Sequence, residues 1–201
     1  MKVDEWLNFF KKHPQKNLFS VSDLKLLVDE PLPSLAVQLT RLVHARVITR
    51  VARGWYANPF YPPSAEEVAM VLRVPSYLSL EYALAKQHVL SQRVYTLTLV
   101  TPRSPYMFQS SVGNIEYHQI KKSLFWGYST EKGILIATPE KAFLDLVYLR
   151  SIHSKELTVN GVQSLLGDMD LEVFEKKKLS KYLDRFGKKT KAFVLQLEIL
   201  C

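Results

Sequence analysis

The sequence predicts an α+β protein with two domains, because three kinds of pattern follow one another along the chain. Three helical patterns and a β-hairpin pattern fill the first 60 residues. A stretch with three prolines follows at residues 58–64, and helical and strand patterns alternate after it. We therefore expect an N-terminal domain over residues 1–60 and a mixed α/β C-terminal domain over residues 61–201.

The first two helices are expected over residues 4–12 and from about residue 20 onward. The first has aromatic side chains on one side and ends where a proline follows His13, since proline disrupts a helix interior. In the second, Ser20 or Ser22 suits the position that caps the helix N-terminus. The expected buried stripe of the second helix consists of Leu24, Leu27 and Val28.

The third helix is expected from Ser34, as its N-terminal cap, to Ala45. A strand over residues 47–51, a turn at residues 52–54 and a returning strand over residues 55–57 follow it. Three helices and a hairpin in this order predict a winged helix-turn-helix, which is a DNA-binding fold. The third helix is expected to bury Leu35, Leu39, Leu42 and Val43, which recur at helical spacing.

The distribution of charge supports DNA binding by this first domain. The net charge is +8, and no acidic residue occurs between Pro31 and Ala65. On the third helix, Gln38 suits a bidentate pair with adenine and Arg41 suits guanine or phosphate, while the hairpin offers arginines to the DNA backbone or minor groove. The alternative interpretation is a plain helical bundle with surface arginines. The predicted DNA-binding residues are Ser34, Val37, Gln38, Arg41, Arg50, Arg53 and Gly54.

The second domain is predicted to contain a central helix that follows Thr138 and is apolar nearly all round to residue 149. Asp145 within it is expected to be buried at least in part and to pair with Lys141 one turn earlier, because a buried carboxylate needs a partner. We interpret Glu140, Lys141 and Asp145 as structural residues. The other expected elements are helices over residues 65–72, 80–87 and 171–186, and strands over residues 94–100, 115–120, 124–128, 134–137 and 193–200.

A second basic block lies near the end of the chain. Between Lys176 and Lys191 there are eight lysines and arginines and a single acidic residue, Asp184. Tyr182 and Phe186 within the block suit stacking on bases, so the alternative to a DNA-binding regulator is an RNA- or protein-interaction module that uses this block. The predicted basic surface consists of Lys176, Lys177, Lys178, Lys181, Arg185, Lys188 and Lys189.

Three stretches of the sequence resemble one protein family. They are LTRL at residues 39–42 with VITRVARGWY at residues 47–56, PSYLSLEYAL at residues 75–84, and IATPEKAFLDL at residues 136–146. Together and in this order they resemble the AbiEi-type antitoxins. The sequence departs from that pattern at Ala45 and Arg46, where the family usually has a glycine that closes the third helix.

The resemblance implies a transcriptional autorepressor that is also the antitoxin of a type IV toxin–antitoxin, or abortive infection, system. It implies duplex DNA as a partner, through an inverted-repeat operator to which a homodimer binds. It also implies a functional partner, a nucleotidyltransferase toxin, which the antitoxin counters without a stable complex.

Enzymatic, metal and membrane functions are not expected. A nucleotidyltransferase needs paired metal-binding carboxylates, and Asp168 and Asp170 are better explained as part of a helix-capping loop. The five histidines are scattered and Cys201 is the single cysteine, so we expect neither a metal nor another cofactor. No run of about 18 apolar residues occurs. Asp4 and Glu5 interrupt the first apolar stretch, which favours a cytoplasmic protein without a signal peptide.

Overall fold

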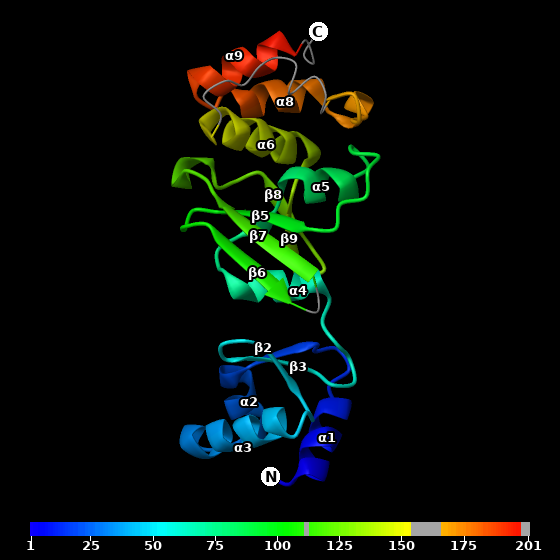
Figure 1. The fold of residues 1–201 in the computed structure, drawn as a ribbon, viewed down its shortest axis with the longest axis vertical. Coiled ribbons are helices and arrows are strands. Elements are labelled where there is room, and N and C mark those ends of the chain that lie inside the picture. The colour runs from blue at the N-terminus through cyan, green and yellow to red at the C-terminus, as the bar shows by residue number, and fades with distance from the viewer. Residues whose placement is uncertain (111–112, 154–165, 198–201) are drawn as a thin grey trace. The chain divides into compact units, whose positions relative to one another are not determined.

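A computed structural model of the chain describes residues 1–110, 113–153 and 166–197. These residues form a mixed α+β structure, as the sequence predicts (Figure 1). The chain divides into two compact units, unit 1 (Met1–Leu72) and unit 2 (Arg73–Cys201). No helix within the described residues is long and apolar enough to cross a membrane.

Unit 1 combines helices with a small antiparallel sheet. Its elements are α1 (Val3–Lys11), β1 (Leu18–Ser20), α2 (Val21–Val28), α3 (Leu32–His44), β2 (Thr49–Ala52), β3 (Trp55–Ala57) and α4 (Ala65–Leu72). The strand order is β1-β3-β2, and the central Tyr56 pairs with Phe19 on one side and Arg50 on the other. The sequence did not predict β1, which is too short to show a strand pattern of its own.

Helix α2 begins at a cap that the sequence predicts. The Ser20 hydroxyl accepts a hydrogen bond from the Asp23 backbone N–H at 3.0 Å, and the Asp23 carboxylate accepts one from the Ser20 N–H at 2.8 Å. This reciprocal pair satisfies two backbone donors near the helix N-terminus. Leu24 is buried as expected. The expectation for Leu27 is wrong: its side chain is 48% exposed, because it lies off the face that Leu24 and Val28 share.

Helix α3 begins at Leu32, so the prediction of Ser34 as its cap is wrong. Pro31 occupies the cap position and Pro33 lies in the first turn. Backbone N–H groups of the first turn have no partner within a helix, so a proline there removes no helical hydrogen bond. The apolar stripe is as predicted, with Leu35, Leu39 and Leu42 buried and Val43 half-buried.

The end of α3 explains how the chain turns there without a glycine. Arg46 has a φ of 56°, in the left-handed region that favours glycine. The backbone N–H groups of Arg46 and Val47 donate to the carbonyls of Val43 and Leu42 at 3.0 and 2.9 Å. An arginine therefore adopts the helix-ending geometry at the position where the sequence departs from the AbiEi-type pattern.

The chain after the hairpin remains attached to unit 1. The buried side-chain amide of Asn58 donates to three backbone carbonyls at the end of α1 and beyond it, including that of Phe10 at 3.1 Å. Asn17 donates from Nδ2 to Glu67 of α4 at 2.9 Å. Unit 1 thus continues through α4. Its core consists of Trp6, Phe10, Phe19, Leu24, Leu35, Leu39, Leu42, Ile48 and Tyr56.

Unit 2 is built on a six-stranded sheet with the strand order β6-β7-β5-β4-β9-β8. The strands are β4 (Tyr77–Leu78), β5 (Leu97–Thr101), β6 (Tyr106–Ser110), β7 (Gly113–Gln119), β8 (Tyr128–Glu131) and β9 (Ile134–Ala137). The pairs β5–β7 and β4–β9 are parallel, and the other neighbours are antiparallel. The helices are α5 (Leu80–Lys86), α6 (Pro139–His153), α8 (Lys176–Leu183) and α9 (Lys188–Gln196), with short 3₁₀ turns η1 (Lys122–Leu124) and η2 (Leu171–Val173).

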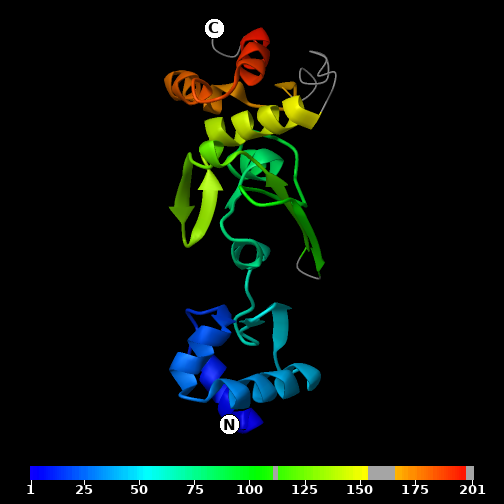
Figure 2. The same ribbon diagram turned by 90° about the vertical axis from the view of Figure 1, so that its left-hand side faces the viewer.

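Helix α6 is the centre of unit 2. In Figure 1 and Figure 2 it lies between the sheet on one side and α8 and α9 on the other, and it also contacts α5. Because neighbours surround it, side chains around its whole circumference are buried, including Phe143, Leu144 and Val147. This agrees with the prediction of a central helix that is apolar nearly all round.

Two expected strands of unit 2 are wrong. Residues 124–128 do not form one, because the chain makes the η1 turn first and Gly127 has a φ of 79°, so the strand β8 begins only at Tyr128. The stretch expected as a strand from Phe193 belongs to helix α9, and residues 198–200 lie outside the described residues. Thr190, Phe193, Val194 and Leu197 are buried at helical spacing, whereas the β-branched and aromatic composition had favoured a strand.

Candidate nucleic-acid interface

One face of α3 is exposed and carries the residues that the sequence predicts to contact DNA. The side chain of Val37 is 51% exposed, and Ser34 and Arg41 are exposed as well. Gln38 is half-buried. The Arg41 side chain makes no ion pair or hydrogen bond with any residue that the structure describes. Because the buried stripe fixes the rotation of α3, Val37 and Arg41 are held on its outer side.

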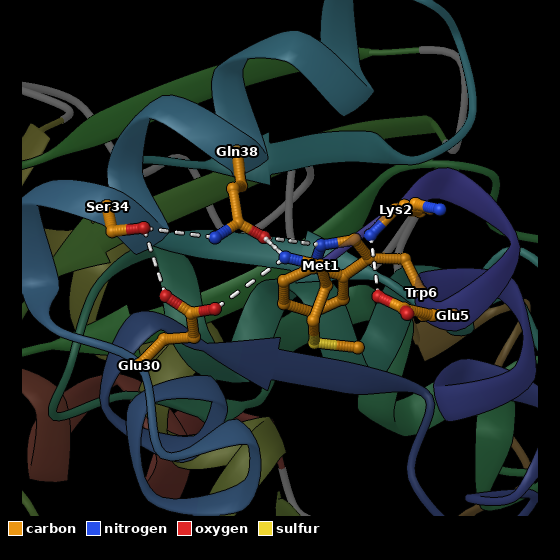
Figure 3. A network of polar contacts seen from close by, with 7 residues as sticks. All are labelled: Met1, Lys2, Glu5, Trp6, Glu30, Ser34 and Gln38. Carbon is orange, nitrogen blue, oxygen red and sulfur yellow. Dashed lines mark hydrogen bonds and ion pairs between the residues drawn. The ribbon is translucent and has the colours of Figure 1, made fainter.

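A network of hydrogen bonds occupies the two polar side chains beside Arg41 (Figure 3). Gln38 Oε1 accepts from the indole N–H of Trp6 at 3.0 Å and from the Met1 amino group at 2.8 Å. Gln38 Nε2 donates to the Ser34 hydroxyl at 3.1 Å, and that hydroxyl donates to Glu30 at 2.9 Å. The amide of Gln38 is thus oriented by α1 on one side and by Ser34 on the other. The sequence did not predict this network.

The network also brings a negative charge to this face. The hydrogen bond from Ser34 lowers the pKa of the Glu30 carboxyl below its ordinary value, so Glu30 is ionised at neutral pH. Its Oε1 lies 3.6 Å from the Met1 amino group. The surface of this stretch therefore does carry a negative charge, although the stretch itself contains no acidic residue. Glu30 immediately precedes the stretch and contacts Ser34 within it.

The hairpin places its two arginines on the surface. Arg50 is exposed and its Nε donates to the Ala52 carbonyl at 3.3 Å, while Arg53 lies exposed in the turn. Gly54 has a φ of 77°, which a residue with a side chain rarely adopts. Its carbonyl accepts a hydrogen bond from the Val21 N–H at 2.9 Å. The turn is therefore fixed to the start of α2, so Arg53 projects from an anchored loop.

The C-terminal basic block divides into two sets of side chains. In the first set, on α8, Lys176, Lys177 and Lys181 are exposed. Lys178 is different, because its Nζ forms an ion pair with the almost fully buried Glu140 carboxylate at 2.8 Å. The second set, Arg185, Lys188 and Lys189, follows α8 and begins α9. The predicted basic surface is thus not one continuous helix face.

The two aromatic residues of this block do not suit stacking on bases. Phe186 is 4% exposed and packs against Trp126 and Tyr148. Tyr182 is half-buried, with its ring edge-on to Trp126 at 4.8 Å between centroids. The hypothesis that Phe186 stacks on a base is therefore wrong, because its ring belongs to the core between α6, α8 and Trp126.

Unit 2 contains a buried polar cluster formed by Tyr77, Ser79, Lys141 and Asp145. Asp145 Oδ2 accepts from the hydroxyls of Tyr77 and Ser79, both at 2.9 Å, and Asp145 Oδ1 pairs with Lys141 Nζ. Lys141 Nζ also donates to the Tyr77 hydroxyl at 2.8 Å. The predicted pair is confirmed, and both of its members are fully buried. Burial raises the pKa of Asp145 and of Tyr77 and lowers the pKa of Lys141.

The surroundings of this cluster are aromatic and closely packed. Lys141 Nζ lies 5.1 Å from the Trp126 ring centroid and 5.4 Å from that of Phe186. A Cβ added at Gly127 would lie 2.9 Å from Lys141 Cγ, so only glycine fits there. A group this well enclosed stabilises the fold and does not meet a substrate, which supports the interpretation of Lys141 and Asp145 as structural.

The two aspartates considered as metal ligands have other contacts. Asp168 Oδ2 accepts from Gln92 Nε2 at 2.5 Å, and Asp170 accepts from the backbone N–H of Glu172 at 3.1 Å, which caps η2. Among the described residues, no group of three histidine, cysteine, aspartate or glutamate side chains is arranged to hold a metal ion.

Comparison with known proteins adds no further evidence. No model of a known protein family matches the chain, and no curated protein matches it.

Proposed function

We propose that unit 1 is a winged helix-turn-helix that binds duplex DNA, with α3 in the major groove and the hairpin on the DNA backbone or in the minor groove. One observation carries this proposal. Arg41 and Val37 project from the outer face of α3, in the same unit as an anchored hairpin whose turn presents Arg53. A recognition helix uses side chains of this kind on base edges, and a wing uses arginines on phosphates.

The network around Gln38 gives the α3 side chains different roles in this proposal. Gln38 Oε1 already accepts two hydrogen bonds, so a bidentate pair with adenine requires that one of them break, whereas Nε2 donates only one of its two N–H groups. Arg41 has no such bonds and contacts base edges directly. Pro33 has no backbone N–H, so the start of α3 offers phosphate fewer donors than a typical helix start. Side chains therefore supply most of the phosphate contacts.

The first test compares two arginine variants on a selected operator and on a scrambled duplex. Arg41→Ala should weaken operator binding by about 1–3 kcal/mol and scrambled-duplex binding very little, because a base contact is lost. Arg53→Ala should weaken both duplexes by similar factors, because a phosphate contact is lost. The operator is obtained by selection from a randomised duplex library, and affinities are measured by fluorescence anisotropy.

Arg103→Ala serves as the matched control, since it removes one exposed arginine from unit 2 and the same charge from the chain. We expect it to leave both affinities nearly unchanged. Equal weakening of the two duplexes by Arg41→Ala would show that α3 does not contact base edges. The assignment of α3 to the major groove would then have to be abandoned.

We further propose that the whole chain is a transcriptional autorepressor and the antitoxin of a type IV toxin–antitoxin system. In this proposal it is not an enzyme, and it counters a nucleotidyltransferase toxin without a stable complex. The support is the sequence resemblance together with one structural observation. The two stretches of unit 2 that resemble the family meet in the buried cluster, which joins Tyr77 and Ser79 of one stretch to Lys141 and Asp145 of the other.

The antitoxin proposal requires a nucleotidyltransferase gene next to this one, and co-expression with the product of that gene tests it. The full chain should restore growth of cells that express the toxin. The Arg41→Ala variant should restore growth equally well when both are driven from an unrelated promoter, because this proposal assigns repression to unit 1 and antitoxicity to unit 2. Cells that remain inhibited by the toxin despite abundant folded antitoxin would contradict the proposal.

A further inference from the structure

Unit 2 contains a basic hollow, which takes its charge from Lys121 and from the second set of the C-terminal block. The hollow has a volume of about 350 Å³ and lies where the start of α9 meets the end of α6 and the chain around η1. Helix α9 contacts α6 and lies with α8 in the outer layer of unit 2 (Figure 1). Among the residues that line the hollow are Lys121, Ser151, Arg185, Lys188, Lys189 and Thr190.

The charge of this basic hollow is strongly positive. Lys121, Arg185, Lys188 and Lys189 line it, and no carboxylate does so among the described residues. The nearby Asp184 forms an ion pair with Lys191 at 3.1 Å. Cations gathered around one concave site repel one another, and an anion bound between them removes this repulsion.

The start of α9 adds backbone donors to these charges. Its cap residue is Gly187, which has no side chain to accept hydrogen bonds from the first turn. The N–H groups at such a helix start carry a partial positive charge and suit a phosphate.

Thr190, in the same first turn, adds a hydroxyl to the lining of the basic hollow. It lines the basic hollow, so its hydroxyl is placed to donate a hydrogen bond to an anion bound there.

Two of the cations are held in place by contacts within unit 2. The Arg185 guanidinium lies 4.0 Å from the centroid of the Trp126 ring, which is a cation–π contact. Lys189 Nζ donates to the Ser151 carbonyl at the end of α6. The positions of these groups are thus set before any ligand arrives, which lowers the entropy that binding has to overcome.

We propose that the basic hollow binds the phosphate group of a small phosphorylated molecule, such as a nucleotide. Its volume lies in the range of small-molecule sites, and its concave lining of cations and hydroxyls suits a compact anion. A nucleic-acid strand is the less favoured ligand, because Phe186 is buried and offers no ring on which a base can stack. The proposal rests neither on DNA binding by unit 1 nor on antitoxicity.

Isothermal titration calorimetry on the full chain tests this, with inorganic phosphate, AMP and adenosine as probes. We expect AMP to bind and adenosine not to bind, because the phosphate carries the interaction. If inorganic phosphate binds as tightly as AMP, the site recognises the phosphate group alone. If AMP binds more tightly, the site recognises a nucleotide. Both results support the proposal. Absence of binding by both phosphate and AMP at millimolar concentration and low salt overturns it, as does equal binding of AMP and adenosine.

The matched variants separate this site from general positive charge. The double variant Lys188→Gln, Lys189→Gln should weaken AMP binding at least about tenfold, as expected for the loss of one or more charged hydrogen bonds. The control is Lys177→Gln, Lys181→Gln, which removes the same charge from exposed positions on α8 outside the basic hollow. We expect it to leave AMP affinity within about twofold, because its lysines are separated from the ligand and screened by solvent.

Two further results would count against the basic hollow. Equal losses of AMP affinity in the two double variants would overturn the site. The site would also be overturned if a single-stranded oligonucleotide bound far more tightly than AMP and lost affinity equally in the two double variants. Binding of duplex DNA by unit 1 is measured on the same variants. The ratio of its affinities for the operator and the scrambled duplex should be unchanged. Failure of the DNA proposal and failure of this one therefore remain distinguishable.

Discussion

Raising the salt concentration from about 50 to about 200 mM should weaken duplex binding by the full chain about 10⁴-fold, if two copies bind one operator. The reason is the release of counterions. Two copies that neutralise about eight phosphates give a slope near −7 in a plot of log K against log salt. Arg50 and Arg53 of the hairpin are exposed and supply part of this charge, together with Arg41.

Fluorescence anisotropy at several salt concentrations measures this slope. Arg53→Ala should make it shallower by about one unit for each copy bound. The control variant Arg103→Ala should not change it. A slope shallower than about −2 in the unmodified chain would contradict duplex binding through phosphate contacts, and the exposed arginines of unit 1 would then be ordinary surface charges.

Local patterns in the sequence predict α1, α2, the buried stripe of α3 and the central helix α6. The cap at Ser20, the buried stripe of Leu35, Leu39 and Leu42, and the start of α6 after Thr138 each depend on residues within two turns of one another. The pair of Lys141 and Asp145 is predictable for the same reason, since the two residues are one helical turn apart.

Elements that depend on distant partners are not predictable in this way. Strands β1 and β4 are too short to show a pattern, and they exist because β3, β5 and β9 supply their hydrogen bonds. The apolar stretch from Phe193 has the composition of a strand, but it lies against α6 and buries one helical face. In both cases the tertiary environment overrides the local preference.

The candidate DNA-contacting face shows the same limit. Its exposed residues follow from helical periodicity once Leu35 and Leu39 are placed in the core. The state of Gln38 does not, because the Trp6 indole that fixes its amide lies 32 residues earlier in the chain. The basic hollow of unit 2 is likewise formed by residues from separate segments, so the sequence shows its charge but not its shape.

Asp145→Ala should lower the free energy of unfolding of unit 2 by about 3–5 kcal/mol, because it leaves the buried Lys141 without its ionic partner. The hydroxyls of Tyr77 and Ser79 lose their acceptor as well. Little water can reach these groups to replace the lost bonds, because all four residues of the cluster are fully buried.

Hydrogen exchange of peptides from α6 during urea unfolding measures this change in unit 2 separately from unit 1. Glu81→Ala is the matched control: it breaks the partly exposed Arg150–Glu81 ion pair of 3.0 Å, whose loss should change the unfolding free energy by at most about 1 kcal/mol. The double variant Lys141→Met, Asp145→Leu should be more stable than Asp145→Ala, because it removes both charges and retains the volume of the side chains. If Asp145→Ala and Glu81→Ala destabilised unit 2 equally, the buried cluster would not be what holds α6 to β4 and the start of α5.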